Sequence, residues 1–287
     1  MKKLKYILPF FSIILGIGLL VYPWISEYLF KNEVNSVINT YDRKLEDISI
    51  MEENKELELA KIYNRQLAES KITLTDPFTQ FEKGKSTMDY QSILSFNELG
   101  LIGTIDIPKI SVHLPIYHGV SDTVLMNGVG HLEKTSFPIG GNSSHCVLTG
   151  HTGLNKARLF TDLSELKKGD YFFIQILHQK LAYQVIETSI VEPQDVHKLQ
   201  IEKERDLVTL LTCYPYGVNT HRLLVLGERM NYQEAVVEEK IQSETNLDSN
   251  PSSQWMSSYK KALMLGSIFS LLLIVGLVIG IQWKDKY

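Results

Sequence analysis

Cysteine is scarce in this chain of 287 residues, which contains only Cys146 and Cys213. Disulfide-stapled secreted domains carry several cysteines at close spacing, so this count excludes such a scaffold. A single disulfide between the two remains possible. Cys146 lies in an apolar run, and free cysteine is among the most buried residue types, so we expect it to be a small buried hydrophobic residue.

Positive charge is also in deficit. The chain has 29 Lys and Arg against 33 Asp and Glu, which gives a net charge of -4 at pH 7. Affinity for a nucleic-acid backbone comes largely from clustered Lys and Arg, and the sequence has no basic stripe. The composition therefore argues against a nucleic-acid partner.

Paired metal ligands are missing, although the chain has eight histidines. There is no HExxH and no CxxC, and the conceivable set of His145, Cys146, His151 and Cys213 lacks the spacing typical of zinc sites. Strands do not alternate with long helices, as they do in dinucleotide-binding folds. We expect neither a metal nor a cofactor. The other histidines are expected at the surface or at strand ends: His113, His118, His131, His178 and His197.

Charge is absent from two long runs near the ends of the chain, residues 6–25 and 262–283. Each is long enough to cross a hydrocarbon core of about 30 Å. We expect a signal anchor at the N-terminus, with a cleaved signal as the alternative because Pro9 and Pro23 interrupt the run. A transmembrane helix is expected at the C-terminus. Lysines beyond both runs favour cytoplasmic termini and an extracytoplasmic domain between them, on the cell membrane.

Residues 101–230 consist of short β-forming runs broken by turn formers, a pattern typical of a barrel or sandwich. A short helix is expected over 154–166. Two amphipathic helices are expected over 31–70, with a break near Ile48 to Asn54 and a packing role against the domain. The polar stretch after Met230 predicts a flexible linker. The expected strands are 101–107, 112–116, 146–149, 171–177, 181–191, 207–212 and 223–227.

The stretch TLLTCYPYGVNTHRLLV, residues 209–225, places a thiol between two predicted strands. Cys213 ends the first strand, turn formers follow, and Arg222 begins the second. Two antiparallel strands would bring the thiol and the guanidinium to one rim. A free thiol has a pKa of about 8.5, so it needs a nearby base or cation to act as a nucleophile. His151, in the segment VLTGHTGL, is the candidate base.

The segments HCVLTGHTGLNKARLFTDL (145–163) and TLLTCYPYGVNTHRLLV resemble the His and Cys/Arg motifs of sortases, and most closely those of the pilin-polymerising class C sortases. The resemblance covers roughly residues 75–230. It implies a mainly β fold with a closed eight-stranded barrel. It also implies that Cys213 attacks the carbonyl after the Thr of an LPxTG-like signal to give a thioester, that Arg222 stabilises the oxyanion, and that His151 transfers protons.

The tripeptide Asp76-Pro77-Phe78 lies upstream of the expected barrel. Asp-Pro initiates turns, so a plain turn that ends the helical region is one interpretation. The segment also resembles the lid of class C sortases, in which an Asp-Pro-aromatic tripeptide covers the active site. If it is a lid, we expect Phe78 over the Cys213 sulfur and Asp76 paired with Arg222.

Three classes of function stay open. The first is a transpeptidase that joins pilins or surface proteins with LPxTG-like signals to a lysine, or in a housekeeping variant to a cell-wall amine. The second is a cysteine hydrolase, and the third is a non-catalytic membrane-anchored binding module. The expected divisions are an N-terminal anchor (1–26), a helical stem (27–74), a lid segment and linker (75–99), the barrel (100–230), a polar linker (231–259), and a transmembrane helix with a short tail (260–287).

Overall fold

The computed structural model describes residues 4–70, 74, 76, 78, 90–153, 157–245, 261, 264 and 266. The chain divides into two compact units. One consists of Met1–Ile25 and Pro251–Tyr287, and the other of Ser26–Asn250. Everything described below, apart from the first part of helix α1, belongs to the second unit.

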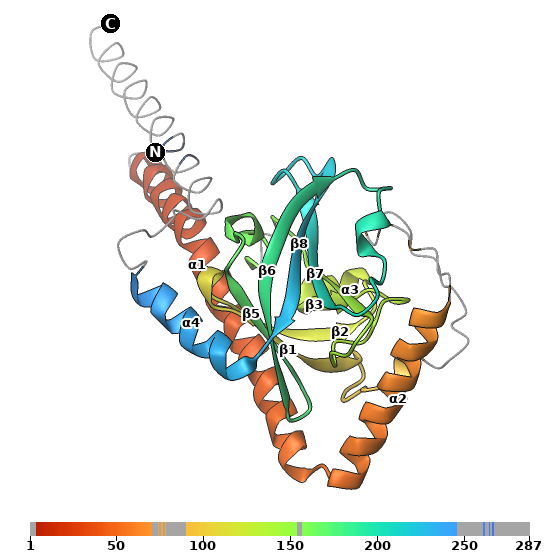
Figure 1. Ribbon diagram of the computed structural model, residues 1–287. Coiled ribbons are helices and arrows are strands. Elements are labelled where there is room, and N and C mark those ends of the chain that lie inside the picture. The colour runs from red at the N-terminus through yellow and green to blue at the C-terminus, as the bar shows by residue number, and fades with distance from the viewer. Residues whose placement is uncertain are drawn as a thin grey trace, which may run out of the picture. The chain divides into compact units, whose positions relative to one another are not determined.

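Eight strands close into a barrel in the order β1-β2-β3-β4-β7-β8-β6-β5 (Figure 1). The closed eight-stranded barrel confirms the fold class expected from the resemblance. Most neighbours are antiparallel, but β2 with β3 and β4 with β7 are parallel. The strands are β1 (Leu101–Ile107), β2 (Val112–His118), β3 (Val129–His131), β4 (Ser144–Thr149), β5 (Tyr171–Ile176), β6 (Gln179–Val191), β7 (Asp206–Tyr214) and β8 (His221–Met230).

The seven strands expected from the sequence are all present, and most extend by a few residues at one or both ends. Strand β3 could not be recognised from the sequence, because Val129–His131 has only three residues and contains a glycine. Apolar side chains from strands around the barrel fill its interior. They include Ile105, Leu148, Phe172, Leu210 and Val225. Close packing of this kind excludes water and fixes the strands that carry the site.

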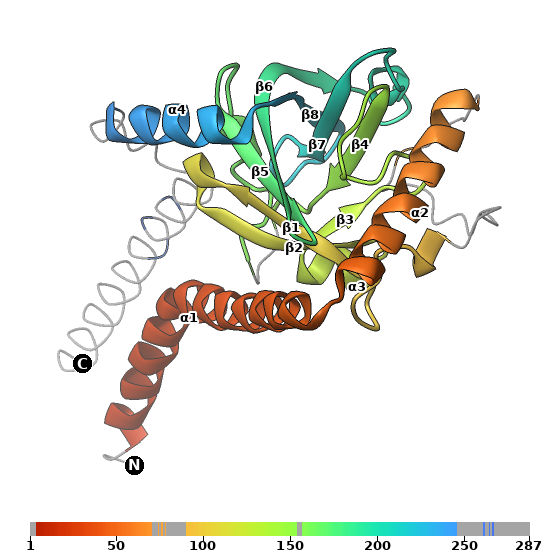
Figure 2. The ribbon, with the colours of Figure 1, turned by 60° about the horizontal axis from the view of Figure 1, so that its bottom comes forward.

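Two helices form the stem. Helix α1 (Leu4–Asp47) and helix α2 (Ile50–Glu69) meet at a sharp bend (Figures 1 and 2). The bend falls within the expected break, and the Ser49 hydroxyl caps α2 by accepting a hydrogen bond from the Glu52 backbone N–H at 3.2 Å.

Both stem helices pack on the barrel, which confirms the packing role expected for them. The Tyr41 hydroxyl of α1 donates to the Ile102 carbonyl at 3.2 Å and accepts from the Leu177 N–H at 2.8 Å. The Asn64 side chain of α2 donates to the Phe137 carbonyl at 3.1 Å and accepts from the Phe137 N–H at 2.7 Å.

The expectation of a flexible linker after Met230 is wrong over its first part. Helix α4 (Tyr232–Thr245) forms there and packs against the barrel beside β6 (Figure 1). Asn231 caps it by accepting from the N–H of Gln233 at 2.9 Å. Ala235 is fully buried against Tyr171 and Ala182. The stretch is polar, but its Glu, Gln, Lys and Ala residues are also good helix formers.

A smaller expectation also fails. Of the helix expected over 154–166, the described part contains only the 3₁₀ turn Leu163–Glu165, because Ala157, Leu159 and Phe160 are each buried from an irregular backbone. His118 and His131 end strands β2 and β3, in line with the strand-end positions expected for them, but both lie buried next to the rings of Tyr90 and Phe137. Stacking against aromatic rings under α2 provides the burial that the sequence did not indicate.

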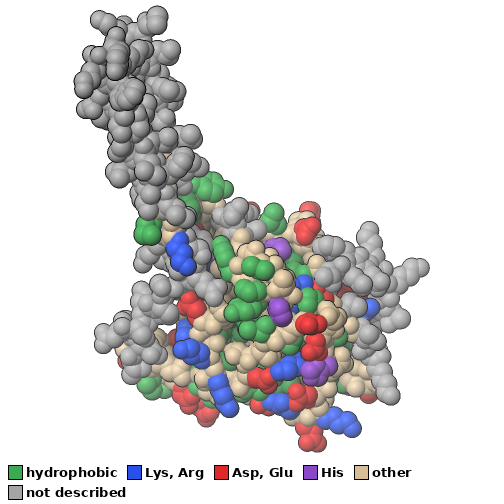
Figure 3. Space-filling model, turned by 90° about the horizontal axis from the view of Figure 1, so that it is seen from above, with side chains coloured by type: hydrophobic (Ala, Val, Ile, Leu, Met, Phe, Trp, Pro, Cys, Tyr) green, Lys and Arg blue, Asp and Glu red, His purple; other side chains and the backbone are tan. Residues whose placement is uncertain are grey.

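Among the described residues, no helix combines the length and the hydropathy that a membrane crossing needs. The C-terminal run 262–283 lies outside the described residues except for Met264 and Gly266. On the face shown in Figure 3, hydrophobic side chains gather in one patch, and acidic and basic side chains intermingle beside it.

Candidate active site

Cys213 and Arg222 lie directly opposite each other where β7 and β8 meet. Opposed residues on antiparallel strands point to the same side of the sheet, so the thiol and the guanidinium share one face. The loop between them turns through residues with positive φ, Gly217 at 74° and Asn219 at 63°. Glycine and asparagine tolerate this conformation, which explains why the turn formers expected from the sequence stand here.

His151 lies in the same row of the sheet. Strands β4 and β7 run in parallel with Thr149 beside Leu211, so two residues further along, His151 comes beside Cys213. Two hydrogen bonds hold this extension of β4 against β7. The Gly150 N–H donates to the Leu211 carbonyl at 3.1 Å, and the Thr212 hydroxyl donates to the Gly150 carbonyl at 2.6 Å. We call His151, Cys213 and Arg222 the reacting row.

The reacting row lies on the outer face of the barrel, next to a cluster of buried apolar side chains. Leu211 and Leu224 lie two residues from Cys213 and Arg222 along their strands, and Val147 lies four residues before His151. These side chains belong to a cluster that is separate from the barrel interior. Leu74, which precedes the Asp76 segment, is a member, and Phe78 packs against the cluster. A substrate chain could lie along this cluster without entering the barrel. We call this cluster the groove; its members are Leu74, Leu132, Val147, Leu199, Leu211 and Leu224.

The Asp76 carboxylate forms an ion pair with the Arg222 guanidinium. The Arg222 Nε and Nη2 atoms donate to the two Asp76 carboxylate oxygens, each at 2.7 Å. Nη1 donates to the backbone carbonyls of Asn219 at 3.2 Å and His221 at 3.0 Å. The side chains of Arg222 and Asp76 are only 6% and 4% exposed, so this bidentate pair is shielded from water. The expected pairing of Asp76 with Arg222 is confirmed.

Phe78 lies against two members of the row, His151 and Arg222. Its ring centroid lies 5.0 Å from the Arg222 Cζ atom and 6.0 Å from the centroid of the His151 ring. The contacts of Phe78 that we observe are thus with His151 and Arg222, the neighbours of the Cys213 sulfur. Pro77 lies outside the described residues. The described part of the tripeptide closes over the reacting row from one side.

Burial sets the protonation states in this closed arrangement. It raises the pKa of the Cys213 thiol; Arg222 opposes this, whereas the Asp76 carboxylate adds to it. Burial lowers the pKa of His151, against a smaller effect of Asp122 in the opposite direction. Both shifts favour the neutral forms, so thiol and imidazole rest uncharged and the proton stays on sulfur.

The second cysteine has no access to this chemistry. Cys146 is 2% exposed in β4, and its side chain belongs to the barrel interior. Burial raises its pKa well above the ordinary value, so the reactive thiolate is strongly disfavoured. Both cysteines are free, so the alternative of a disulfide between them is not realised here.

Sequence reasoning missed two residues that shape the site. Thr212 positions the loop before His151 through its bond to Gly150. A hydroxyl in an otherwise apolar strand, directly before the thiol, was the available signal. Leu74 in the groove lies far from the motifs in sequence, and nothing local marked it.

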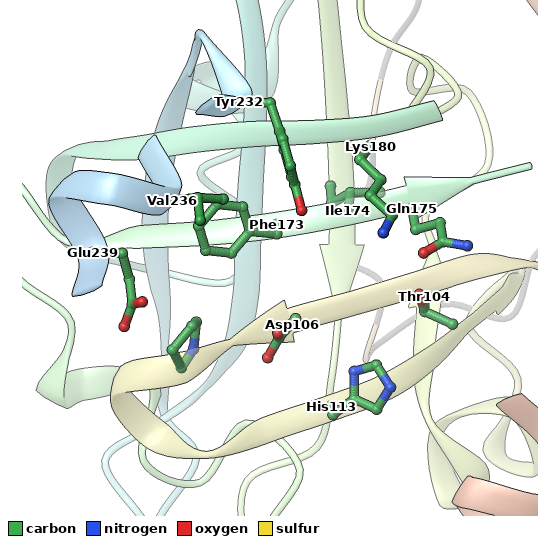
Figure 4. A pocket seen from close by; sticks show the side chains of 11 residues that line it. Thr104, Asp106, His113, Phe173, Ile174, Gln175, Lys180, Tyr232, Val236 and Glu239 are labelled. Atoms are coloured by element: carbon green, nitrogen blue, oxygen red, sulfur yellow. The ribbon is translucent and has the colours of Figure 1, made fainter. Parts of the chain in front are cut away.

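A separate cavity of about 300 Å³ lies across the barrel, between α4 and strands β1, β2, β5 and β6 (Figure 4). Asp106, His113 and Glu239 contribute to its walls, with Phe173 and Tyr232 as aromatic lining. Burial raises the pKa of Asp106, and Glu239 adds to this while His113 opposes it. No thiol lines this cavity, so the reacting row remains the candidate active site.

Comparisons with known proteins agree with this geometry. The family model described as a sortase domain matches residues 105–230. Sortase D of Bacillus subtilis (strain 168) is 30% identical over 169 residues, which are 57% of this chain and 82% of that protein.

Among solved structures, sortase C1 of Streptococcus agalactiae in complex with MTSET is 42% identical, covers 68% of this chain and 97% of its own, and has a TM-score of 0.62. A pilus-related sortase C of group B Streptococcus is 43% identical, covers 67% of this chain and 96% of its own, and has a TM-score of 0.62. With its barrel, its thiol and these relatives, the chain belongs to the sortase family of cysteine transpeptidases and, within it, to class C.

Proposed function

We propose that this sortase cleaves an LPxTG-like sorting signal between Thr and Gly and transfers the acyl part to an amine, the side chain of a pilin lysine, in pilus assembly. One observation carries the proposal: His151, Cys213 and Arg222 form a single row on the outer barrel face, beside the groove of apolar side chains. The pilin part rests on the similarity to the pilus-related sortase C.

In the first half-reaction, the Cys213 sulfur bonds to the carbonyl carbon of the Thr residue while its proton passes to His151. The C–N bond to Gly then breaks, and His151 gives that proton to the leaving amine. The products are a thioester on Cys213 and a free amino-terminal Gly. The Arg222 guanidinium stabilises the oxyanion formed between these steps, and such a donor in a water-poor site can contribute several kcal/mol.

In the second half-reaction, a neutral lysine amine attacks the thioester carbonyl. The C–S bond breaks as the new C–N bond forms. His151 takes the surplus proton of the amine and returns it to the sulfur, so the enzyme regains its starting state. Water in place of the amine would give hydrolysis. No oxidant, metal or cofactor enters the balance.

The closed arrangement has to open before this chemistry. Asp76 uses the Nε and Nη2 donors that an oxyanion would need, and Phe78 lies against His151 and Arg222. We therefore assign Asp76, Pro77 and Phe78 to a lid. A tethered segment competes at an effective concentration around millimolar, so a weakly binding peptide gains access slowly.

Membrane tethering completes the proposal. The uncharged runs 6–25 and 262–283 would anchor the enzyme at both ends, with the barrel outside the cytoplasm, where surface proteins pass.

The test is to incubate the full chain with an LPxTG peptide and a peptide carrying a single lysine, and to identify the products by mass. We expect a branched product joined through the lysine. His151→Ala should abolish it. Arg222→Lys should reduce it strongly, because an ammonium cannot replace the planar fork of Arg. Cleavage with only the free acid as product would instead identify a hydrolase, and absence of any cleavage by the lid variant Asp76→Ala would contradict the proposed substrate.

A further inference from the structure

Thr149 stands out in the row directly below the reacting row. The strand register places it beside Leu211, which in turn faces Leu224. Side chains alternate along a strand, so Thr149 shares the outer face with Val147 and His151. Leu211, Leu224 and Val147 all belong to the groove. Thr149 is therefore a polar side chain among the apolar side chains of the groove, in the row next to that of the Cys213 thiol.

The Thr149 hydroxyl is fully buried and has no hydrogen-bond partner within the described part of the chain. Buried hydroxyls are nearly always paired, because an unpaired one forfeits its hydrogen bonds to water. Neighbouring threonines follow that rule. The Thr209 hydroxyl lies 2.8 Å from His145 Nε2, and the Thr212 hydroxyl donates to the Gly150 carbonyl at 2.6 Å. Of these three threonines of the described sheet, Thr149 alone is unpaired.

The side chains that pack on the groove offer this hydroxyl no partner. Leu74 and Phe78, which pack on the groove, have purely apolar side chains, and the Asp76 carboxylate is engaged by Arg222. A substrate peptide would differ from the lid side chains in one respect. Its backbone presents an N–H or a carbonyl at every residue except proline, and these groups need partners when they leave water.

We propose that Thr149 is a substrate-positioning residue whose hydroxyl bonds the backbone of the sorting-signal peptide, just on the amino-terminal side of the scissile bond, and only once the lid has left the groove. The proposal rests on the function proposed above. The bond is absent in the closed state and present in the occupied one, so it favours displacement of the lid by substrate. It also fixes the register of the peptide, and therefore which carbonyl meets Cys213.

The test compares Thr149→Val, which keeps the shape and removes the hydroxyl, with Thr149→Ser, which keeps the hydroxyl. Both are made in the full chain carrying Asp76→Ala, so that lid opening does not mask binding. For Thr149→Val we expect KM for the LPxTG peptide to rise roughly three- to tenfold, in line with one lost hydrogen bond. In the chain that keeps Asp76, and therefore the closed lid, Thr149→Val should leave the melting temperature level or raise it, because an unpaired hydroxyl has been replaced by a methyl. Thr149→Ser should keep a KM near that of its parent.

Thr209→Val is the matched control. It removes a hydroxyl from the neighbouring strand, two rows from the thiol, whose partner is His145. We expect a lower melting temperature with KM unchanged, the reverse of the result for Thr149→Val. A peptide in which esters replace single amides before the scissile bond then locates the contact. The ester at the contacted position should weaken binding to the parent but not to Thr149→Val.

An unchanged KM for Thr149→Val would overturn the inference. So would a fall in melting temperature accompanied by equal losses in Thr149→Val and Thr149→Ser, because that pattern indicates a packing role. If the parent Asp76→Ala chain fails to cleave the peptide at all, the proposed function fails. A melting temperature of Thr149→Val that is level or higher in the chain with Asp76 would still show that the hydroxyl is unpaired in the closed enzyme.

Discussion

Arg222 is the residue through which the lid and the thiol influence each other. Its guanidinium faces Cys213 across the strand pair and is held by Asp76 from the other side. The Asp76–Arg222 ion pair has no net charge, so it cannot stabilise a Cys213 thiolate as an unpaired guanidinium would. If Asp76 belongs to the proposed lid, the contact that blocks the substrate would also protect the thiol from unwanted alkylation or oxidation.

Removal of the Asp76 charge should make Cys213 more reactive. Asp76 raises the pKa of the thiol and Arg222 lowers it, so Asp76→Ala lowers that pKa. The alkylation rate of a thiol rises with pH until the thiolate dominates. We therefore expect a midpoint at lower pH and a several-fold faster reaction with iodoacetamide at pH 7. Asp42→Ala, at an exposed position of α1, is the control. Identical pH profiles for the two variants would remove the lid from the control of Cys213.

The two cysteines should behave differently toward substrate. Cys213→Ala is expected to abolish both the acyl adduct and the product, whereas Cys146→Ala keeps the adduct, because Cys146 lies in the barrel interior. Alanine fills less volume than cysteine in the packed core, so Cys146→Ala should still reduce the free energy of unfolding by about 1 kcal/mol. Intact-protein mass after incubation with an LPxTG peptide decides the question. An adduct on the Cys213→Ala chain would contradict the assignment.

For individual residues, the sequence was informative where the catalytic chemistry requires a recognisable motif. The loop between Cys213 and Arg222 carries its own turn residues, so their opposition could be inferred. The position of His151 in the same row could not, because it depends on the parallel pairing of β4 with β7 across a long stretch of chain. The unpaired Thr149 hydroxyl was equally invisible, since the lid that covers it comes from far upstream.

Among the elements, α2 has one buried polar side chain that makes two hydrogen bonds to the same backbone residue of the barrel domain. Asn64 is buried, and it both donates to and accepts from the backbone of Phe137. Asn64→Ala leaves the Phe137 N–H and carbonyl without partners, so we expect a loss of about 1–3 kcal/mol in the free energy of unfolding by urea. Asn39→Ala, at an exposed position of α1, should change it by less than about 0.5 kcal/mol. Equal effects would show that the Asn64 bonds contribute nothing net.

The elements that could be predicted were those with a strong local period. The longer strands and the bend between α1 and α2 follow from hydrophobic runs and from a capping serine. β3 is too short to have a period, and α4 shows none that distinguishes it from a solvated linker. What stabilises α4 is tertiary contact, such as the buried Ala235 and the bond from the Gln242 side chain to the Gly169 carbonyl at 3.2 Å.

For the whole molecule, the proposed double tether makes a separable prediction. We expect the full chain to remain with membranes after extraction with alkaline carbonate, as a spanning protein does. A chain that lacks residues 251–287 should remain as well, through the N-terminal run. Protease added to intact cells without their wall should degrade the barrel. Recovery of the full chain in the carbonate supernatant would contradict the tether.

The stem and the lid form one continuous stretch of chain. Helix α2 ends at Glu69 against the barrel, and Leu74 already lies in the groove, so residues 70–73 alone join them. The hold of the proposed lid would therefore depend partly on how firmly the stem is docked. Warming that loosens the stem before the barrel melts would release the lid, and turnover of peptides would climb faster with temperature than chemistry alone requires. Latency would then be a thermal property of the stem helices.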